Sequence, residues 1–177
     1  CEIPKEWNVV KLKEVFKLKN GVRPTFSENG KYLVYGANGI MGLTDDFLID
    51  NDFTIIFGRV GASGEIHIAK GKVWISDNAI YTENYDREKI YPYFAYYLLK
   101  WKNLKQHATK TTHPIITQTF LNSFKVSLPP LYEQQKIAEI LSRWDEIIEM
   151  KKEKKKRLER MKKKIMELLL TGKVRVK

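Results

Sequence analysis

Two patterns of hydrophobic residues divide the chain near residue 130. Before it, short runs of apolar residues alternate with polar ones, as in half-buried strands. After it, residues 131–171 contain neither glycine nor proline and repeat leucine and isoleucine at helical spacing. The pattern predicts a strand-rich domain over residues 1–130, followed by a long helix within residues 131–177.

Seven strands are expected in the first part, because seven short runs are rich in β-branched and aromatic residues. Glycines lie between most of these runs and permit the positive φ angles that tight connections need. The expected strands are residues 9–12, 32–35, 54–57, 65–69, 72–76, 79–83 and 124–128.

Two short helices are expected within the same part. Pro92 suits a first helical turn, and a second helix is expected to begin at Thr117, whose hydroxyl can cap it. The domain is therefore predicted to be α/β, of the mixed α+β type with a strand-rich core. Apolar residues recur at helical spacing on the first helix, at Phe94, Tyr97, Leu98 and Trp101, and the second helix is expected to bury Phe120 and Leu121.

The long helix has a hydrophobic seam. Written in heptads from Ile137, eight of its ten seam positions are apolar, and Lys151 and Lys154 interrupt them. At 1.5 Å per residue, the helix up to Gly172 is about 60 Å long, too long to pack along one small domain. The pattern favours a coiled coil with a partner helix, and a helix folded back on its own domain is the alternative. The apolar seam residues are Ile137, Ile140, Trp144, Ile147, Leu158, Met161, Ile165 and Leu168.

The charge of the chain indicates an anionic partner. Its formal net charge is +11 and its pI is about 9.6, which suits nucleic acid, although a highly charged soluble surface is the alternative. Residues 1–130 hold 17 basic and 13 acidic residues, and residues 131–177 hold 15 and 8. Without an apolar run of 18 residues or a leader pattern, and with a single cysteine, a cytoplasmic protein that does not contact membranes is expected.

The sequence motifs that could indicate catalysis or metal binding each lack a required residue or spacing. Residues 128–132 (LPPLY) lack the asparagine of the adenine-methyltransferase loop, and residues 58–64 (GRVGASG) lack the glycine spacing of a phosphate-binding loop. His67, His107 and His113 lack the spacing of a zinc site. We therefore expect no catalytic residues, no metal and no cofactor in this chain.

Side chains suited to DNA contact collect in the glycine-bordered loops. Arginine, lysine, asparagine and threonine can bind base edges or phosphates, and glycine lets the backbone approach a ligand closely. Loops are polar in most proteins, so solvated surface is the alternative for each residue. The candidate DNA-binding residues are Lys19, Arg23, Asn38, Arg59, Lys110, Thr111 and Thr112.

Several segments resemble one family. Residues 128–141 (LPPLYEQQKIAEIL) resemble the Pro-Pro-Leu-x-Glu-Gln-x-x-Ile-Ala signature of the specificity (S) subunits of type I restriction–modification systems. Residues 3–7 (IPKEW) with 10–12 (VKL) are similar to the start of that family's recognition domain, and residues 168–176 (LLLTGKVRV) to the close of its helical region. Residues 58–64 (GRVGASG) and 74–79 (WISDNA) also resemble the family's interior.

This resemblance implies a target-recognition domain followed by a helix that forms an antiparallel coiled coil. It also implies double-stranded DNA as a ligand, with methyltransferase and restriction subunits as partners, and S-adenosylmethionine bound by the methyltransferase rather than by this chain. A complete subunit of the family has two such units. The chain is thus expected to be either a half-subunit that forms a homodimer or half of a longer subunit.

Two other functions remain as alternatives. One is a small DNA-modifying enzyme, a methyltransferase or nuclease, with an unrecognised site. The other is a coiled-coil scaffold whose domain binds protein. Turnover by the pure chain would favour the enzyme, and the absence of salt-dependent duplex binding would favour the scaffold.

Overall fold

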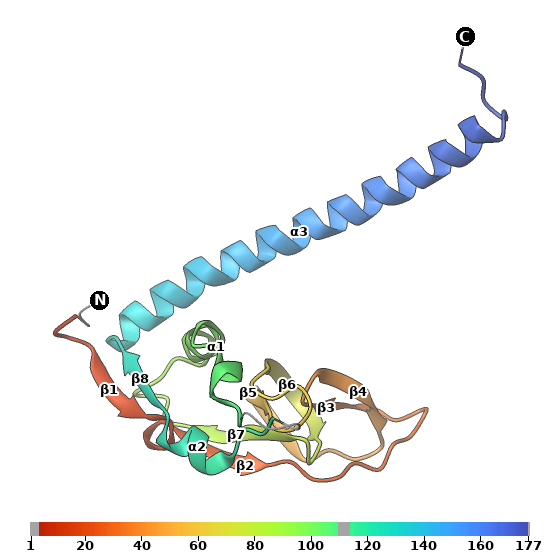
Figure 1. The fold of residues 1–177 in the computed structure, drawn as a ribbon. Coiled ribbons are helices and arrows are strands. Elements are labelled where there is room, and N and C mark those ends of the chain that lie inside the picture. The colour runs from red at the N-terminus through yellow and green to blue at the C-terminus, as the bar shows by residue number, and fades with distance from the viewer. Residues whose placement is uncertain (1–3, 110–113, 177) are drawn as a thin grey trace. The chain divides into compact units, whose positions relative to one another are not determined.

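The chain folds into two compact units, residues 1–138 and 139–177 (Figure 1). The structure is a computed structural model that describes residues 4–109 and 114–176. The fold of the first unit is mixed α+β with a strand-rich core, as the sequence predicts.

Six strands form the main sheet, in the order β2-β7-β5-β6-β3-β4. All neighbours are antiparallel except β3 and β6. A separate two-stranded sheet pairs β1 (Asn8–Lys11) with β8 (Lys125–Leu128). The main strands are β2 (Phe16–Asn20), β3 (Tyr32–Gly36), β4 (Gly39–Thr44), β5 (Ile49–Gly58), β6 (Ile66–Ile75) and β7 (Ala79–Tyr85).

The predicted strands need three corrections. The runs at 65–69 and 72–76 belong to one strand, β6, which passes through Gly71 at a φ of +68° beside an irregularity in its pairing with β5, between Asn51 and Thr54. Strand β5 begins at Ile49, five residues before the predicted start. The edge strands β2 and β4 were not predicted, since β2 contains only two apolar residues and glycines interrupt β4.

The short helices lie where the sequence places them. Helix α1 spans Pro92–Trp101 and α2 spans Gln118–Ser123, while η1 (Leu12–Glu14) and η2 (Leu104–His107) are 3-10 turns. The Thr117 hydroxyl accepts a hydrogen bond from the Phe120 N–H at 3.1 Å, which confirms the predicted cap. The buried face of α1 is Phe94, Ala95 and Leu99, whereas Trp101, which continues the helical spacing, is 75% exposed.

Helix α3 spans Leu131–Leu170, which confirms the predicted long helix. It begins directly after two prolines, where the carbonyl of Pro130 accepts the N–H groups of residues 133 and 134. Its last residue is Leu170, and Gly172, two residues further on, has a φ of +69° that fits a left-handed helix cap. The first unit includes the first two turns of α3, up to Ala138. In the described part of the chain, no helix has the length and apolarity needed to cross a membrane.

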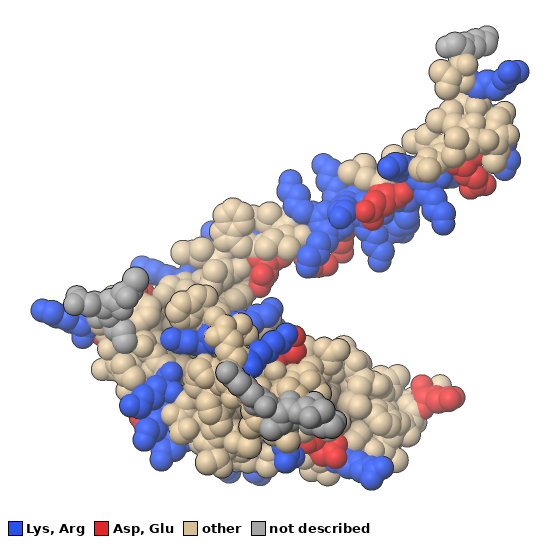
Figure 2. Space-filling model, in the orientation of Figure 1, with Lys and Arg blue, Asp and Glu red and all other residues tan. Residues whose placement is uncertain are grey.

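Charges are unevenly divided along α3. Residues 139–150 hold four acidic residues and one basic residue, whereas residues 151–164 hold ten basic and two acidic residues. We call residues 151–164 the basic segment; every side chain in it is exposed. Lys and Arg atoms gather along the middle of the helix in Figure 2.

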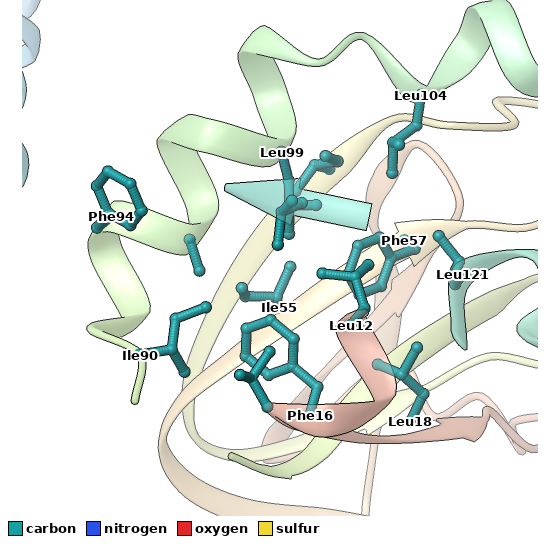
Figure 3. Packing of buried hydrophobic residues seen from close by; sticks show 14 of the residues in the cluster. Leu12, Phe16, Leu18, Ile55, Phe57, Ile90, Phe94, Leu99, Leu104 and Leu121 are labelled. Carbon is teal, nitrogen blue, oxygen red and sulfur yellow. The ribbon is translucent and has the colours of Figure 1, made fainter. Parts of the chain in front are cut away.

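Two hydrophobic clusters hold the first unit together. Alternation along β5 sends Ile55 and Phe57 to the larger cluster and Ile56 to the smaller one. The larger cluster also takes residues from η1, β2, α1 and α2 (Figure 3). This packing fixes the strand ends, and the loops that follow them are therefore held on a rigid base.

Candidate DNA interface

The loop between β5 and β6 requires two of its three glycines for close packing. A Cβ on Gly58 would lie 2.1 Å from the Ala62 carbonyl oxygen, and one on Gly64 would lie 2.4 Å from the Lys105 nitrogen. Gly64 and Gly61 also have φ angles of +82° and +83°. The glycines of residues 58–64 therefore allow a tightly folded loop, which contains Arg59, rather than forming a phosphate-binding loop.

This loop is anchored to residues 114–116. The Arg59 carbonyl accepts hydrogen bonds from the Ile116 N–H at 3.0 Å and from the Ser63 hydroxyl at 2.8 Å. Thr109 and Ile115 also bond to each other, through N–H to carbonyl at 3.2 Å and N–H to hydroxyl at 2.9 Å. Lys110, Thr111 and Thr112 lie outside the described residues, so their predicted DNA contacts remain untested.

Arg59 also contacts the turn between β6 and β7. Its N–H donates to the Asn78 carbonyl at 2.9 Å, and its guanidinium Nη1 donates to the Asp77 carbonyl at 3.4 Å. The Ser76 hydroxyl holds this turn, because it donates to the Asp77 carboxylate at 3.0 Å and accepts the Asn78 N–H at 3.3 Å. The side chain of Asn78 is exposed.

The β3–β4 turn is the third segment at this site, beside the β5–β6 loop and the β6–β7 turn. Gly39, with a φ of +96°, permits the turn, and His67 Nε2 lies 3.3 Å from the Ala37 carbonyl oxygen. A cavity of about 360 Å³ separates this turn from the β5–β6 loop. Its lining includes two asparagines, Asn38 and Asn78, and three apolar side chains, Ile40, Met41 and Val60.

The arrangement combines hydrogen-bonding groups with apolar contact surface. Asparagine amides can donate to and accept from a base edge, arginine can bind a base edge or a phosphate, and aliphatic groups can contact a thymine methyl group. Asn38 and Arg59, which are 21 residues apart in the sequence, belong to adjoining loops in the structure. The geometry therefore suits recognition of a nucleic acid better than covalent chemistry.

Comparison with known proteins decides the family. The family model of the type I restriction modification DNA specificity domain matches residues 4–160. The chain belongs to this family. The MjaVIII specificity subunit of Methanocaldococcus jannaschii, a type I restriction enzyme subunit, is 37% identical over 99% of this chain and 48% of its own length. The putative MjaX specificity subunit of the same organism is 32% identical over 99% of this chain and 45% of its own length.

The specificity domain spans about half the length of these curated relatives. Its fold is also that of solved S subunits. The type I restriction–modification S subunit from M. genitalium superposes with a TM-score of 0.72 at 24% identity, over 84% of this chain and 42% of that chain. The HsdS subunit from Thermoanaerobacter tengcongensis gives 0.63 at 18% identity, over 85% of this chain and 40% of that chain.

Two predicted DNA-binding residues lie elsewhere in the specificity domain. Lys19 is on edge strand β2 rather than in a loop, and it forms an ion pair with Glu83, as does Lys17 at 2.7 Å. Hydrogen bonds from Lys17 and Lys19 hold the pKa of Glu83 below its usual value. Arg23 is exposed just after Val22, whose N–H donates to the Ile75 carbonyl at 2.9 Å.

Asn78 was not among the residues predicted from sequence. The segment Trp74-x-Ser76-Asp77-x-Ala79 was noted only for its family resemblance, although serine and aspartate before an asparagine are a turn signal. That signal predicts that Asn78 lies in a turn, but it does not predict that the turn contacts Arg59. Among the residues that the structure describes, no three His, Cys, Asp or Glu side chains group as metal ligands.

The seam residues of α3 fall into two groups. Ile137 is half-buried and packs against the larger core cluster, so it serves the domain. Six others, from Ile140 to Ile165, are exposed by 38–59% of their surface, and Leu168 is half-exposed. The largest side chain among them is that of Trp144, which is 59% exposed.

Proposed function

We propose that this chain recognises a DNA sequence and directs a separate methyltransferase subunit to it, within a type I restriction–modification system. Family membership supports the role. The observation that carries it is the convergence of Asn38, Arg59 and Asn78 from three loops held on one rigid sheet. Three loops that meet can present hydrogen-bonding groups to neighbouring base pairs together.

The proposal divides the work between subunits. S-adenosylmethionine binds to the methyltransferase partner, restriction subunits join the same assembly, and this chain supplies recognition without a catalytic step of its own. A location in the cytoplasm, where bacterial and archaeal DNA lies, belongs to the same proposal. The similarity to specificity subunits of type I restriction enzymes supports this division.

Reconstitution tests the proposal. The chain is mixed with the methyltransferase subunit of its system, S-adenosylmethionine and genomic DNA, and the methylated positions are sequenced. We expect methylation at one recurrent sequence with both proteins present, and none with either protein alone. Methylation or cleavage by this chain alone, with S-adenosylmethionine and Mg²⁺, would refute the non-catalytic role.

We also propose that two copies pair through α3 in antiparallel orientation. The seam is self-complementary about its centre, between Lys151 and Lys154. In an antiparallel pair centred there, apolar positions face apolar positions, and the lysines face each other across the axis, where their ammonium groups can reach water. The facing pairs are Ile147 with Leu158, Trp144 with Met161, and Ile140 with Ile165.

The charge distribution along α3 supports the same orientation. Residues 139–150 carry a net charge of −3, from four acidic residues and one basic residue, and the basic segment carries +8. An antiparallel centred pair places the acidic part of each helix beside the basic segment of the other. A parallel pair in register would place the two basic segments side by side, which is electrostatically unfavourable.

A further inference from the structure

The basic segment of α3 carries far more positive charge than its surroundings can balance. It holds eight lysines and two arginines against two glutamates within residues 151–164. Within the described residues, only two of these cations form an ion pair: Lys152 with Glu149 at 3.2 Å and Lys155 with Glu159 at 3.9 Å. Pairing with the acidic residues 139–150 of a second copy would still leave a net charge of about +5 per chain, from +8 and −3.

We infer that the basic segment is a second DNA-contacting surface, which binds the phosphates of duplex DNA without reading its sequence. Part of it lies away from the seam: Lys152, Lys156 and Lys163 occupy heptad positions opposite the seam residues. These three lysines stay exposed when the seam is covered by a partner helix. They span about 16 Å along the helix, which corresponds to roughly five phosphates of one DNA strand.

The composition of the segment favours DNA over an acidic protein as the occupant. Protein interfaces are enriched in aromatic residues, methionine and arginine and depleted in lysine. Lysines outnumber arginines four to one in this segment, and its apolar residues, Leu158 and Met161, both belong to the seam. Lysine binds phosphate as a point charge, which is sufficient where charge matters more than fixed geometry, as along a DNA backbone.

The inference rests on the proposed function only in supposing that DNA is the ligand. It assigns sequence recognition and non-specific affinity to two different surfaces of the same chain. The domain loops determine which sequence is bound, and the basic segment adds affinity that depends on salt and not on sequence.

The test measures how duplex binding depends on salt. The full chain is titrated against a fluorescein-labelled 40-base-pair duplex of arbitrary sequence, at several salt concentrations. The variant K152Q/K156Q/K163Q is compared with K5Q/K13Q/K125Q, which removes the same charge from the domain. Glutamine retains helix propensity, and circular dichroism with sedimentation checks that helix and assembly are intact.

Each phosphate contact contributes about −0.9 to the slope of log affinity against log salt concentration. We expect the helix variant to reduce the size of the slope by about 2 to 3 and to weaken binding at low salt by roughly tenfold or more. The control should change the slope by less than about 1. Equal slopes for the helix variant and the unaltered chain would overturn the inference.

Two further outcomes separate this inference from others. If the helix variant keeps the salt slope but binds the methyltransferase subunit less tightly, the segment contacts an acidic protein surface and the inference fails. If the slope changes as expected but the reconstituted complex methylates no recurrent sequence, the inference stands and the proposed recognition function fails.

Discussion

The backbone N–H of Tyr91 donates a hydrogen bond to the side-chain oxygen of Gln134 at 2.8 Å. The same side chain donates to the carbonyls of Lys89 at 2.9 Å and Pro129 at 2.8 Å, and it is only 1% exposed. A glutamine in the first turns of α3 thus satisfies three backbone groups around the start of α1 and the end of β8. This gives a structural role to the glutamine of the Pro-Pro-Leu-x-Glu-Gln signature.

Replacement of Gln134 by alanine should destabilise the domain strongly. The change leaves three backbone groups without partners, and one buried unpaired group costs about 1–3 kcal/mol. We expect the free energy of unfolding in urea to fall by about 2–4 kcal/mol, since water reaches some of these groups. Gln135→Ala, at an exposed neighbouring position, should change it by no more than about 0.5 kcal/mol. Equal losses in the two variants would contradict this role.

Two glycines of the Arg59 loop should respond differently to alanine. Both Gly61 and Gly64 have positive φ angles, which cost a residue with a Cβ about 1–2 kcal/mol. Only at Gly64 would the new Cβ also meet backbone, 2.4 Å from the Lys105 nitrogen, whereas nothing lies within 4 Å at Gly61. Thermal unfolding should therefore show a clearly lower midpoint for Gly64→Ala than for Gly61→Ala. The reverse order would mean that the loop packs differently.

Arg59 and Asn78 should influence which sequence is methylated. A good contact to a base edge is worth about 1–3 kcal/mol, so Arg59→Ala or Asn78→Ala should relax one position of the target or abolish methylation in the reconstituted complex. The matched control is Lys155→Ala with Lys156→Ala, on α3, which should leave the methylated sequence unaltered. A target shifted by the helix changes, and unchanged by the loop changes, would place sequence recognition on the helix.

Self-association should depend on the seam. Ile147→Asp with Leu158→Asp puts charges where the paired helices exclude water, so the double variant should sediment as a monomer at micromolar concentration. Met166→Asp, at an exposed apolar position off the seam, should leave the dimer intact. If the unaltered chain is itself a monomer under these conditions, the proposed homodimer is refuted.

The target of a homodimer should be an interrupted palindrome. Two copies related by a two-fold axis read the same half-site on opposite strands. Deletion of one heptad, residues 151–157, keeps the seam in phase and shortens the helix by about 10 Å. The unread spacer should then shorten by two or three base pairs, at 3.4 Å of rise per pair. Methylation mapping in cells that carry the chain and its methyltransferase measures both, and an asymmetric target would exclude the homodimer.

The sequence by itself determined the elements whose causes are local. A stretch without glycine or proline, between Pro130 and Gly172, specifies α3, and the Thr117 hydroxyl specifies the start of α2. Capping, proline geometry and apolar periodicity act over a few residues, so a linear pattern contains them. The family signature was equally local, since residues 128–141 carry it without a break.

The tertiary structure alone decided which distant residues meet. Strand β2 forms because β7 supplies its hydrogen-bonding partners. The same pairing places Lys19 of β2 close to Glu83 of β7, with which it forms an ion pair. Asn78 lies in the candidate interface because β5 pairs with both β6 and β7, and the turn between β6 and β7 therefore lies beside the end of β5. There the Asn78 carbonyl accepts a hydrogen bond from the Arg59 N–H. Gln134 finds Tyr91 from 43 positions away. Strand pairing and buried hydrogen bonds depend on the packing of the whole domain, and no local pattern encodes those pairings.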